Sequence, residues 1–355
     1  MEMFRKRNLE NIKTIFEEKT GVELETVQPR RSTAKVVLLA AVLTCLFVLT
    51  GYATATSLGI DDALKDFFRE RQKAPLSDSQ ENYVGDHAAA IGESVTCNGV
   101  TVTVGGAISD GTTMYILLNI RAEEGLRIEE LPLGFDMEMK KLRAEGEEND
   151  LVGSVSTSCI PIADDDGQEN TASMLMEYRV YPPLGSTFSF ADGRSRTLQL
   201  RDLHYYAKEY PYDRKTVAEG LWEYEIVLTA PEGQETELLA APVAGSYTQI
   251  SGNSVDATIH SIRAKGLSVT VYYTLAADAV QEAGDFGVLR FTMQDGTVVP
   301  AYPEKAGQTV RIENGDLMMG TECHYCTYAF AAPVNSEQIT TLYLAGEAIE
   351  VNVPS

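Results

Sequence analysis

The sequence predicts a mainly β protein in which two β-sandwich domains follow a single membrane-spanning helix near the N-terminus. Residues 36–60 contain no charged side chain, which is typical of a membrane span. From about residue 88 onward, short alternating apolar and polar runs are separated by Gly, Asp, Asn and Pro, as in β-sheet proteins. The net charge also changes sign between these regions, from +2 over residues 1–35 to −25 over residues 61–355.

The length and composition limit the class of protein. The 355 residues suffice for two folded domains with appendages, and 44% hydrophobic and 23% charged residues are ordinary for globular protein. The formal net charge of −23 argues against nucleic acid as a partner, because binding to phosphates needs clustered Lys and Arg. Five cysteines are too few for a fold built on disulfides.

The predicted membrane helix covers residues 36–58. About 20 apolar residues cross a hydrocarbon core of about 30 Å, and this segment has that length. Arg30, Arg31 and Lys35 precede it, so the rule that positive charge stays inside places residues 1–35 in the cytoplasm. We therefore expect a single-pass protein of the cell membrane, with the lipid bilayer as a partner and with extracytoplasmic C-terminal domains.

A cleaved signal peptide is the alternative, because Ala53-Thr54-Ala55 resembles a cleavage site. The charged region before the span is 35 residues long, and the apolar stretch exceeds the roughly 7–15 residues of a signal peptide. Both lengths favour an uncleaved anchor.

The cytoplasmic tail, residues 1–35, contains a predicted short amphipathic helix from Asn8 to Gly21. Its apolar residues fall on one face, and such a short helix needs a surface to pack on. The helix either lies on the inner leaflet or binds a cytoplasmic protein. The candidate docking residues are Leu9, Ile12, Ile15 and Phe16.

Residues 59–87 are expected to form a stalk or linker outside the membrane. Asp61 and Asp62 are suited to cap a second short helix, with Leu64, Phe67 and Phe68 on one face. This helix either continues the membrane helix or lies on the outer surface. Ala74-Pro75 ends it, and Ser77 to Gly85 is predicted to be a polar, turn-rich linker.

The first β-domain is predicted over residues 88–232. Val100 to Val104 alternates with a period of two after the turn dipeptide Asn98-Gly99, and Met114 to Ile120 is a longer apolar strand. Turns recur at the spacing of a β-sandwich. The other predicted strands are Phe135–Leu142, Val152–Ile162, Met174–Tyr181, Thr197–Leu203 and Leu221–Thr229.

The second β-domain is predicted over residues 243–355, after a break that begins at Pro231. Ser268 to Tyr273 alternates as a half-buried strand does, and Asp295-Gly296 marks a hairpin turn. The predicted strands are Val255–Arg263, Leu267–Leu275, Val288–Met293, Thr297–Val299, Thr309–Ile312, Cys326–Ala331, Ile339–Leu344 and Ile349–Val353.

Two segments of the first domain resemble a known family. They read I-G-E-S-V-T-C-N-G-V-T-V-T-V at residues 91–104 and I-S-D-G-T-T-M-Y-I at residues 108–116. The bacterial family named domain of unknown function 4179 has a similar S-V-T-x-N-G segment, followed by a D-G-T strand. Cys97 stands where that family usually has an Asp. The resemblance is close over these segments and looser to about Thr229.

The resemblance implies a membrane-bound protein of a Gram-positive bacterium, with a tail, one span, a β-domain and a second, immunoglobulin-like β-domain. We therefore expect two extracytoplasmic immunoglobulin-like β-sandwich domains. Many proteins of this kind are described as anti-sigma-factor-like, or as membrane-bound partners of extracytoplasmic-function sigma factors. The family has no assigned catalytic residues, so none is transferred to this chain.

The segment Cys323-His324-Tyr325-Cys326 is the most prominent chemical pattern. Cys323 and Cys326 are a possible thiol or disulfide site, but redox pairs usually lie at a helix N-terminus, and this context is β-rich. A zinc site needs two more ligands, which no spacing identifies. Ordinary strand cysteines, a disulfide among Cys97, Cys159, Cys323 and Cys326, and a metal or redox site all remain open.

Other patterns carry little chemistry. Asp164-Asp165-Asp166-Gly167 does not have EF-hand spacing, and no nucleophile-elbow, zinc-protease or kinase motif occurs. The aromatic residues near Pro211 favour core and edge packing over a carbohydrate- or peptide-binding face. These residues are Tyr205, Tyr206, Tyr210, Tyr212 and Trp222. We expect no catalytic residue, cofactor or metal, and hence no enzyme.

The expected function is that of an anti-sigma-factor-like regulator or an envelope sensor. In this interpretation the tail binds a cytoplasmic partner, a sigma factor, and the outer domains respond to an unidentified ligand or to the state of the envelope. The alternative is a surface-displayed binding or structural module of the envelope whose tail only sets topology. A secreted hydrolase is a third, weaker interpretation.

Overall fold

The computed structural model describes residues 60–128, 132–140, 142, 154–162, 168–181, 188–206, 213–228, 235–276, 284–310, 323–344 and 347–351. The chain divides into two compact units, residues 1–49 and 50–355, and every described residue lies in the second. The predicted tail helix with its docking residues and the predicted span, 36–58, therefore lie outside the described residues. Among the described helices, none has the length and apolar composition needed to cross a bilayer.

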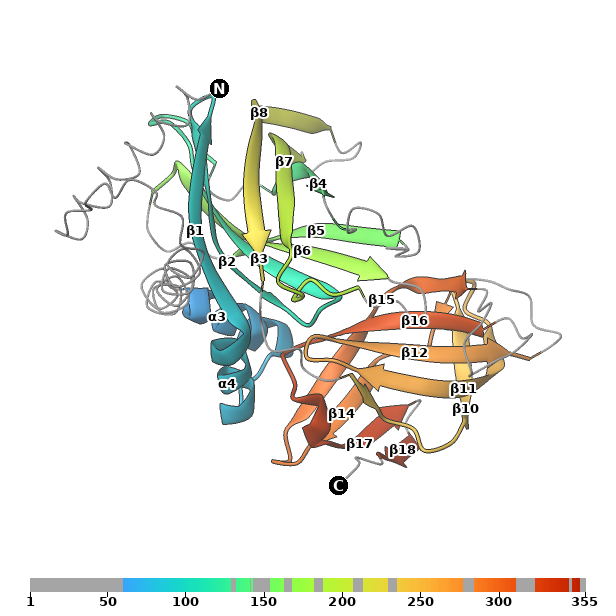
Figure 1. Cartoon of the computed structure of the whole chain (residues 1–355). Coiled ribbons are helices and arrows are strands. Elements are labelled where there is room, and N and C mark those ends of the chain that lie inside the picture. Colours follow the sequence, from blue (N-terminus) through green and yellow to red (C-terminus); the bar gives the residue numbers. More distant parts are fainter. Residues whose placement is uncertain are drawn as a thin grey trace, which may run out of the picture. The chain divides into compact units, whose positions relative to one another are not determined.

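The described part of the chain is mainly β, as predicted, with two α-helices before the strands. The helices are α3 (Ile60–Gln72) and α4 (Asp78–His87). The strands of the first domain are β1 (Ala88–Cys97), β2 (Val100–Ser109), β3 (Thr113–Arg121), β4 (Leu133–Lys140), β5 (Ser154–Ile162), β6 (Thr171–Tyr181), β7 (Ser195–Tyr206) and β8 (Arg214–Val227). Figure 1 shows the order of these elements.

The strands of the second domain follow. They are β9 (Thr236–Glu237), β10 (Val243–Gln249), β11 (Ser254–Ala264), β12 (Ser268–Leu275), β13 (Gly284–Asp285), β14 (Leu289–Met293), β15 (Val298–Val310), β16 (Cys323–Phe330), β17 (Ile339–Leu344) and β18 (Glu347–Glu350). A single 3-10 turn, η1 (Ser336–Gln338), precedes β17.

Helix α3 forms where the sequence predicted a capped helix. Its apolar face is buried, with Leu64 and Phe68 almost inaccessible to solvent. Asp61 and Asp62 lie in the first turn, and Arg69 and Arg71 lie in the last turn, so both ends have the side-chain charge that the helix dipole favours.

Helix α4 occupies the segment in which a turn-rich linker was expected. Ser77 and Gln80 form a capping box, in which each side chain bonds the backbone N–H of the other residue. Tyr83 and Val84 are buried. The polar composition of Ser77 to Gly85 thus concealed a helix that is stabilised by its cap and by two buried side chains.

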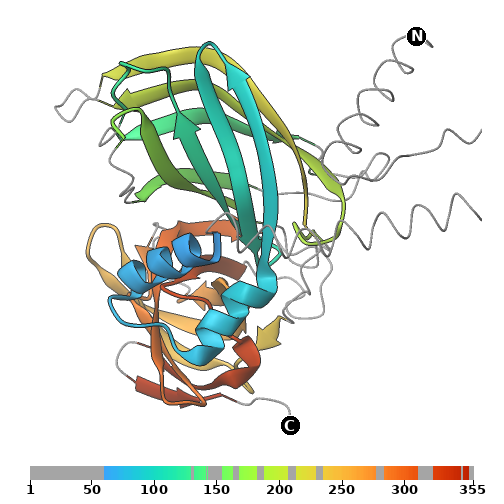
Figure 2. The ribbon, with the colours of Figure 1, turned by 90° about the vertical axis from the view of Figure 1, so that its left-hand side faces the viewer.

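The first domain consists of two antiparallel sheets that enclose one core. One sheet has the strand order β1-β2-β3-β6-β5, and the other has the order β4-β7-β8. Side chains of both sheets contribute to the same buried cluster, which makes the arrangement sandwich-like. Figure 2 shows β1 and β2 facing the strands of the smaller sheet.

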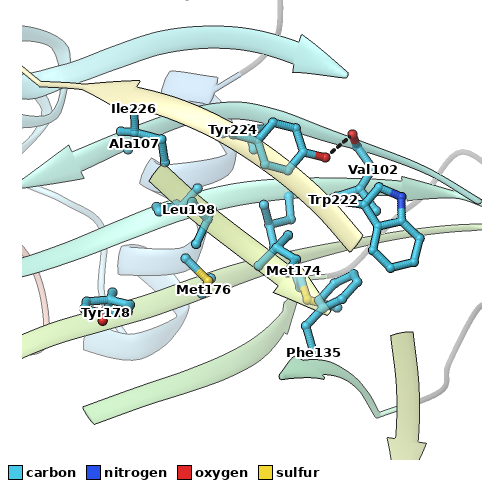
Figure 3. Close-up of a cluster of buried hydrophobic side chains, with 14 of the residues drawn as sticks. Val102, Ala107, Phe135, Met174, Met176, Tyr178, Leu198, Trp222, Tyr224 and Ile226 are labelled. Carbon is cyan, nitrogen blue, oxygen red and sulfur yellow. Dashed lines mark hydrogen bonds between the residues drawn. The ribbon is translucent and has the colours of Figure 1, made fainter. Parts of the chain in front are cut away.

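Two aromatic residues of β8 connect the sheets across this core (Figure 3). The Trp222 indole N–H donates to the Val100 carbonyl, and the Tyr224 hydroxyl donates to the Val102 carbonyl at 2.6 Å. Both side chains are fully buried, and Trp222 packs edge-on against Phe135. The expected packing role of Trp222 is confirmed. Tyr205 packs at the margin of the same cluster, and residues 210–212 lie outside the described part.

The second domain is one antiparallel sheet with the path β13-β10-β11-β12-β16-β15-β14-β17-β18, and β9 pairs with β11. Strand β15 lies inside this path and joins its two halves. Its first residues pair with β14, and its later residues pair with β16 across two register shifts. Residues from both ends enclose one core, so β15 is the corner at which the sheet folds over itself.

This corner explains one difference from the predicted strands. Thr297–Val299 and Thr309–Ile312 were expected to be separate strands. The structure continues β15 through this region, with a register shift between Pro303 and Lys305. Strands β1 and β10 were also missed, because Ala88–Ile91 and Val243–Gln249 are rich in Ala and Gly and show weak alternation.

Candidate functional site: the junction of the helices and the two domains

The described helices pack between the two β-domains in a third buried cluster, which we call the junction. Its apolar residues come from α3, α4, the first domain and the second domain. They are Ile60, Leu64, Phe67, Phe68, Leu76, Tyr83, Val84, Ile108, Tyr115, Leu117, Leu175, Leu267 and Ala332. The segment that was expected to be a stalk therefore contributes to a core of its own.

The five-stranded sheet has both faces covered, which accounts for the continuous apolar sequence of β3. Met114, Ile116 and Leu118 point into the core of the first domain, whereas Tyr115 and Leu117 point into the junction. Successive residues of a strand point to opposite faces, so a strand buried on both sides is apolar at every position. The same alternation on β6 places Leu175, Glu177 and Arg179 on the junction side.

A buried ionic network, the charge cluster, lies in the junction. It consists of Arg71 from α3, Tyr115 from β3, Glu177 and Arg179 from β6, and Glu304 from β15 of the second domain. Two arginines and two carboxylates balance each other in charge. Such balance is required for burial, because an unpaired charge in a protein interior destabilises the folded state by several kcal/mol. Removal of one partner of a buried pair typically destabilises it by about 3–5 kcal/mol.

Arg179 is the centre of the charge cluster. Its side chain is only 2% exposed, and its guanidinium lies 2.7 Å from a carboxylate oxygen of Glu177 and 3.2 Å from one of Glu304. Its Nε has no hydrogen-bond partner among the described residues. Arg179 thus joins the first domain to the second by an ion pair in which the arginine is almost inaccessible to solvent and Glu304 is 18% exposed.

Arg71 approaches the same carboxylate from α3. Its guanidinium lies 3.5 Å from Glu304 and donates a 2.6 Å hydrogen bond to the Tyr115 hydroxyl, which in turn donates to Glu177 at 3.2 Å. The guanidinium also lies over the Phe67 and Tyr115 rings. Glu304 is therefore held from two sides, by the helix and by the first domain.

Burial governs the titration of this cluster. Desolvation raises the pKa of Glu304, and the neighbouring Arg179 and Arg71 oppose that effect. For Arg71, burial lowers the pKa, but the Tyr115, Glu177 and Glu304 groups outweigh it and leave the pKa raised. Both arginines therefore stay charged at any physiological pH.

A second carboxylate crosses the junction in the opposite direction. Asp110 lies in the turn between β2 and β3 and is 7% exposed. One of its oxygens accepts bonds from the backbone N–H groups of Thr112 and Thr113 in its own turn. The other accepts from the Leu267 N–H at 3.1 Å and from the Ser268 hydroxyl at 2.6 Å, both in the second domain. Asp110 thus both shapes its turn and binds the neighbouring domain.

Helix α4 makes a further polar contact with the second domain. The Ser79 hydroxyl donates to the Gln338 side-chain oxygen at 2.9 Å. The Tyr83 ring lies against Gly266, and a Cβ atom at that glycine would overlap the Tyr83 hydroxyl. A side chain at position 266 would therefore displace α4.

The arrangement is suited to holding the helices and the two domains in register. Its charged groups are bound to one another, and within the described ranges no group of three or more His, Cys, Asp or Glu is placed to hold a metal ion. What the junction provides is a mechanical connection between the helices and both β-domains.

The cysteines predicted as a candidate site lie elsewhere. Cys326 is buried in the second domain, where its Sγ lies 3.7 Å from the Tyr328 hydroxyl, and it is a free thiol, as are Cys97 and Cys159. Cys323 begins β16, and its side chain is outside what the structure describes. The Asp164–Gly167 loop also lies outside the described residues.

The junction residues were not predicted from the sequence, although two signals were present. The M-L-M-E-Y-R-V sequence at residues 174–180 places Glu177 and Arg179 two residues apart in an apolar strand, which puts them on one face. Asp110 is the Asp of the D-G-T pattern at residues 110–112. No sequence pattern near these residues identifies Glu304 as their partner.

Replacement of Gly266 tests the close approach of α4. Gly266→Ala is expected to lower the free energy of unfolding by about 1–3 kcal/mol, because the added methyl group overlaps the Tyr83 hydroxyl. Gly85→Ala, in α4 itself, is the matched control. No atom lies within 4 Å of the added methyl, so this change should stabilise by up to about 1 kcal/mol. Urea unfolding measures both, and equal effects of the two substitutions would contradict the contact.

The thiols of Cys326, which is buried, and Cys159, which is partly buried, give a prediction about reactivity. Burial raises the pKa of Cys326 to about 12 and that of Cys159 to about 11, so neither forms much thiolate at pH 8. Iodoacetamide applied to the folded protein at pH 8 should leave both unmodified, and the same reagent should modify both after denaturation without a reductant. Peptide mass mapping measures the result. Rapid labelling in the folded state, or no labelling after denaturation, would contradict the assignment as free thiols that desolvation keeps protonated.

Comparison with known proteins gives one family and one solved structure. Residues 28–122 match the model of the family described as Domain of unknown function (DUF4179). "The crystal structure of the conserved domain protein from Bacillus anthracis" is similar at 15% identity, covering 75% of this chain and 77% of that chain, with a TM-score of 0.41. No curated protein matches the chain. The resemblance at residues 91–116 is thus supported, and it extends over the region that contains the predicted span, both described helices and Asp110.

Proposed function

We propose that this protein is a non-enzymatic, single-pass membrane protein that acts as an anti-sigma-factor-like regulator or envelope sensor. The tail, residues 1–35, binds a cytoplasmic protein partner, a sigma factor, through Leu9, Ile12, Ile15 and Phe16. The two β-domains, the second of them immunoglobulin-like, are extracytoplasmic and respond to the envelope. The DUF4179 match over residues 28–122 supports the family resemblance from which this proposal is drawn.

One observation supports signalling more than simple display. Helix α3 begins at Ile60, directly after the predicted span at 36–58, and Ile60 is itself fully buried in the junction. The chain that leaves the predicted span therefore enters a packed core at once, without a long flexible linker. A displacement of either β-domain would act on α3, and α3 is joined directly to the segment predicted to reach the cytoplasm.

The charge pattern supports the same orientation. The described domains carry the acidic excess, and the tail carries the net positive charge that favours the cytoplasmic side. An acidic exported surface keeps the domains soluble and disfavours binding to anionic lipids and polymers.

The tail is tested by replacing its apolar face in the full-length chain. A variant with Leu9, Ile12, Ile15 and Phe16 all changed to Ser should lose the cytoplasmic partner, because an amphipathic helix binds through its apolar face. The control changes Glu10, Lys13, Glu17 and Lys19 to Ser, which alters four residues without changing the net charge. Crosslinking in the source bacterium, followed by purification and mass spectrometry, measures the partner.

A sigma factor should be enriched with the native tail and with the control, and should fall at least about tenfold with the apolar-face variant. Enrichment of no sigma factor, or equal enrichment with all three tails, would overturn the proposal. The second outcome would favour a displayed envelope module whose tail only sets topology.

A further inference from the structure

The two β-domains have separate cores, so their arrangement depends on the junction. The buried cluster of the first domain contains residues from Val100 to Leu228, and that of the second contains residues from Leu238 to Leu344. No residue belongs to both clusters within the described ranges. Each domain can therefore remain packed while the contact between them changes.

Two carboxylates, Asp110 and the partly buried Glu304, connect the domains in opposite directions. Asp110 of the first domain accepts from Leu267 and Ser268 of the second, and Glu304 of the second domain is bound by Arg179 of the first and by Arg71 of α3. Both depend on the same relative position of the two domains. A displacement that breaks one set of bonds moves the other set out of range as well.

Charged contacts of this kind set position more than they add stability. The free energy needed to remove two ions from water is nearly as large as the free energy gained from their attraction. A buried ion pair therefore contributes little net stability, but it is sensitive to small displacements. Opening would return Arg71, Arg179 and Glu304 to water and would allow the Arg179 Nε, unpartnered among the described residues, to be hydrated. The closed and open arrangements are therefore closer in free energy than the closed and unfolded states.

We infer that Asp110 and the charge cluster act as one two-state device, which holds the domains together when closed and releases them as intact units when it opens. This inference rests on the proposed function for its biological meaning, because opening would free α3 from the second domain and so change the connection to the predicted span. As a property of the domains it stands without any cytoplasmic partner. Asp110 and Glu304 are positioning residues in this device.

The test uses a reporter that the altered residue does not touch. The Leu267 N–H bonds to Asp110, not to Glu304, so a local effect of Glu304→Gln would leave its exchange with solvent unchanged. If the contact opens as a unit, Glu304→Gln should accelerate hydrogen–deuterium exchange at the Leu267 amide by about tenfold or more. Arg179→Gln, from the other side of the pair, should act in the same direction.

The measurement is made on the full-length chain in lipid nanodiscs, by mass spectrometry with fragmentation to single amides. Amides of β8 around Trp222 and of β12 around Val271 report on the two cores and should exchange as in the unaltered protein. Glu350→Gln, at an exposed position of β18, is the matched control and should change none of them.

Unchanged or slower exchange at Leu267 in Glu304→Gln would overturn the inference. So would acceleration of the β8 or β12 amides to the same degree as Leu267, because that result would mean unfolding rather than separation of intact domains. Neither result depends on the tail, so the inference and the proposed partner can fail independently.

Discussion

The Glu304 carboxylate, bound between Arg179 and Arg71, is the contact on which the arrangement of the helices and domains depends. Three separate parts of the fold meet at this one side chain: α3, the five-stranded sheet of the first domain, and the corner strand β15 of the second. Its burial is tolerable only because Glu177 completes a balanced set of two positive and two negative groups. A shift of any of the three parts would leave a charge unpaired in a poorly solvated place.

The fold supplies the surroundings that this contact needs. The five-stranded sheet uses one face for its own core and gives the other to the junction, so that Tyr115, Glu177 and Arg179 stand beside an apolar cluster. Strand β15 crosses from one half of the second domain to the other, and Glu304 lies at the register shift where it does so. Asp110, in a turn shaped by its own backbone bonds, adds the reciprocal contact.

Much of the fold could be predicted from the sequence, because its signals are local. The strand periodicity, the Asn98-Gly99 turn and the apolar face of α3 follow from neighbouring residues, and the structure agrees with each. Helix α4 was missed because a polar sequence with Gly85 outweighed the Ser77–Gln80 cap. The junction was missed for another reason: its bonds join residues 157 apart at Asp110–Leu267 and 233 apart at Arg71–Glu304. A local sequence pattern cannot identify partners that are so far apart in the chain. These residues come together only when the folded domains pack against each other.

A stalk would let the β-domains move without consequence for the predicted membrane segment, whereas a packed junction would couple the two. Asp110 and Glu304, which belong to different domains and do not touch the same groups, should therefore be energetically coupled. A double-mutant cycle with Asp110→Asn and Glu304→Gln, followed by urea unfolding, tests it most directly. The double variant should be less destabilised than the sum of the single variants by at least about 1 kcal/mol, because either change alone already releases the contact. Additive effects within about 0.3–0.5 kcal/mol would contradict it.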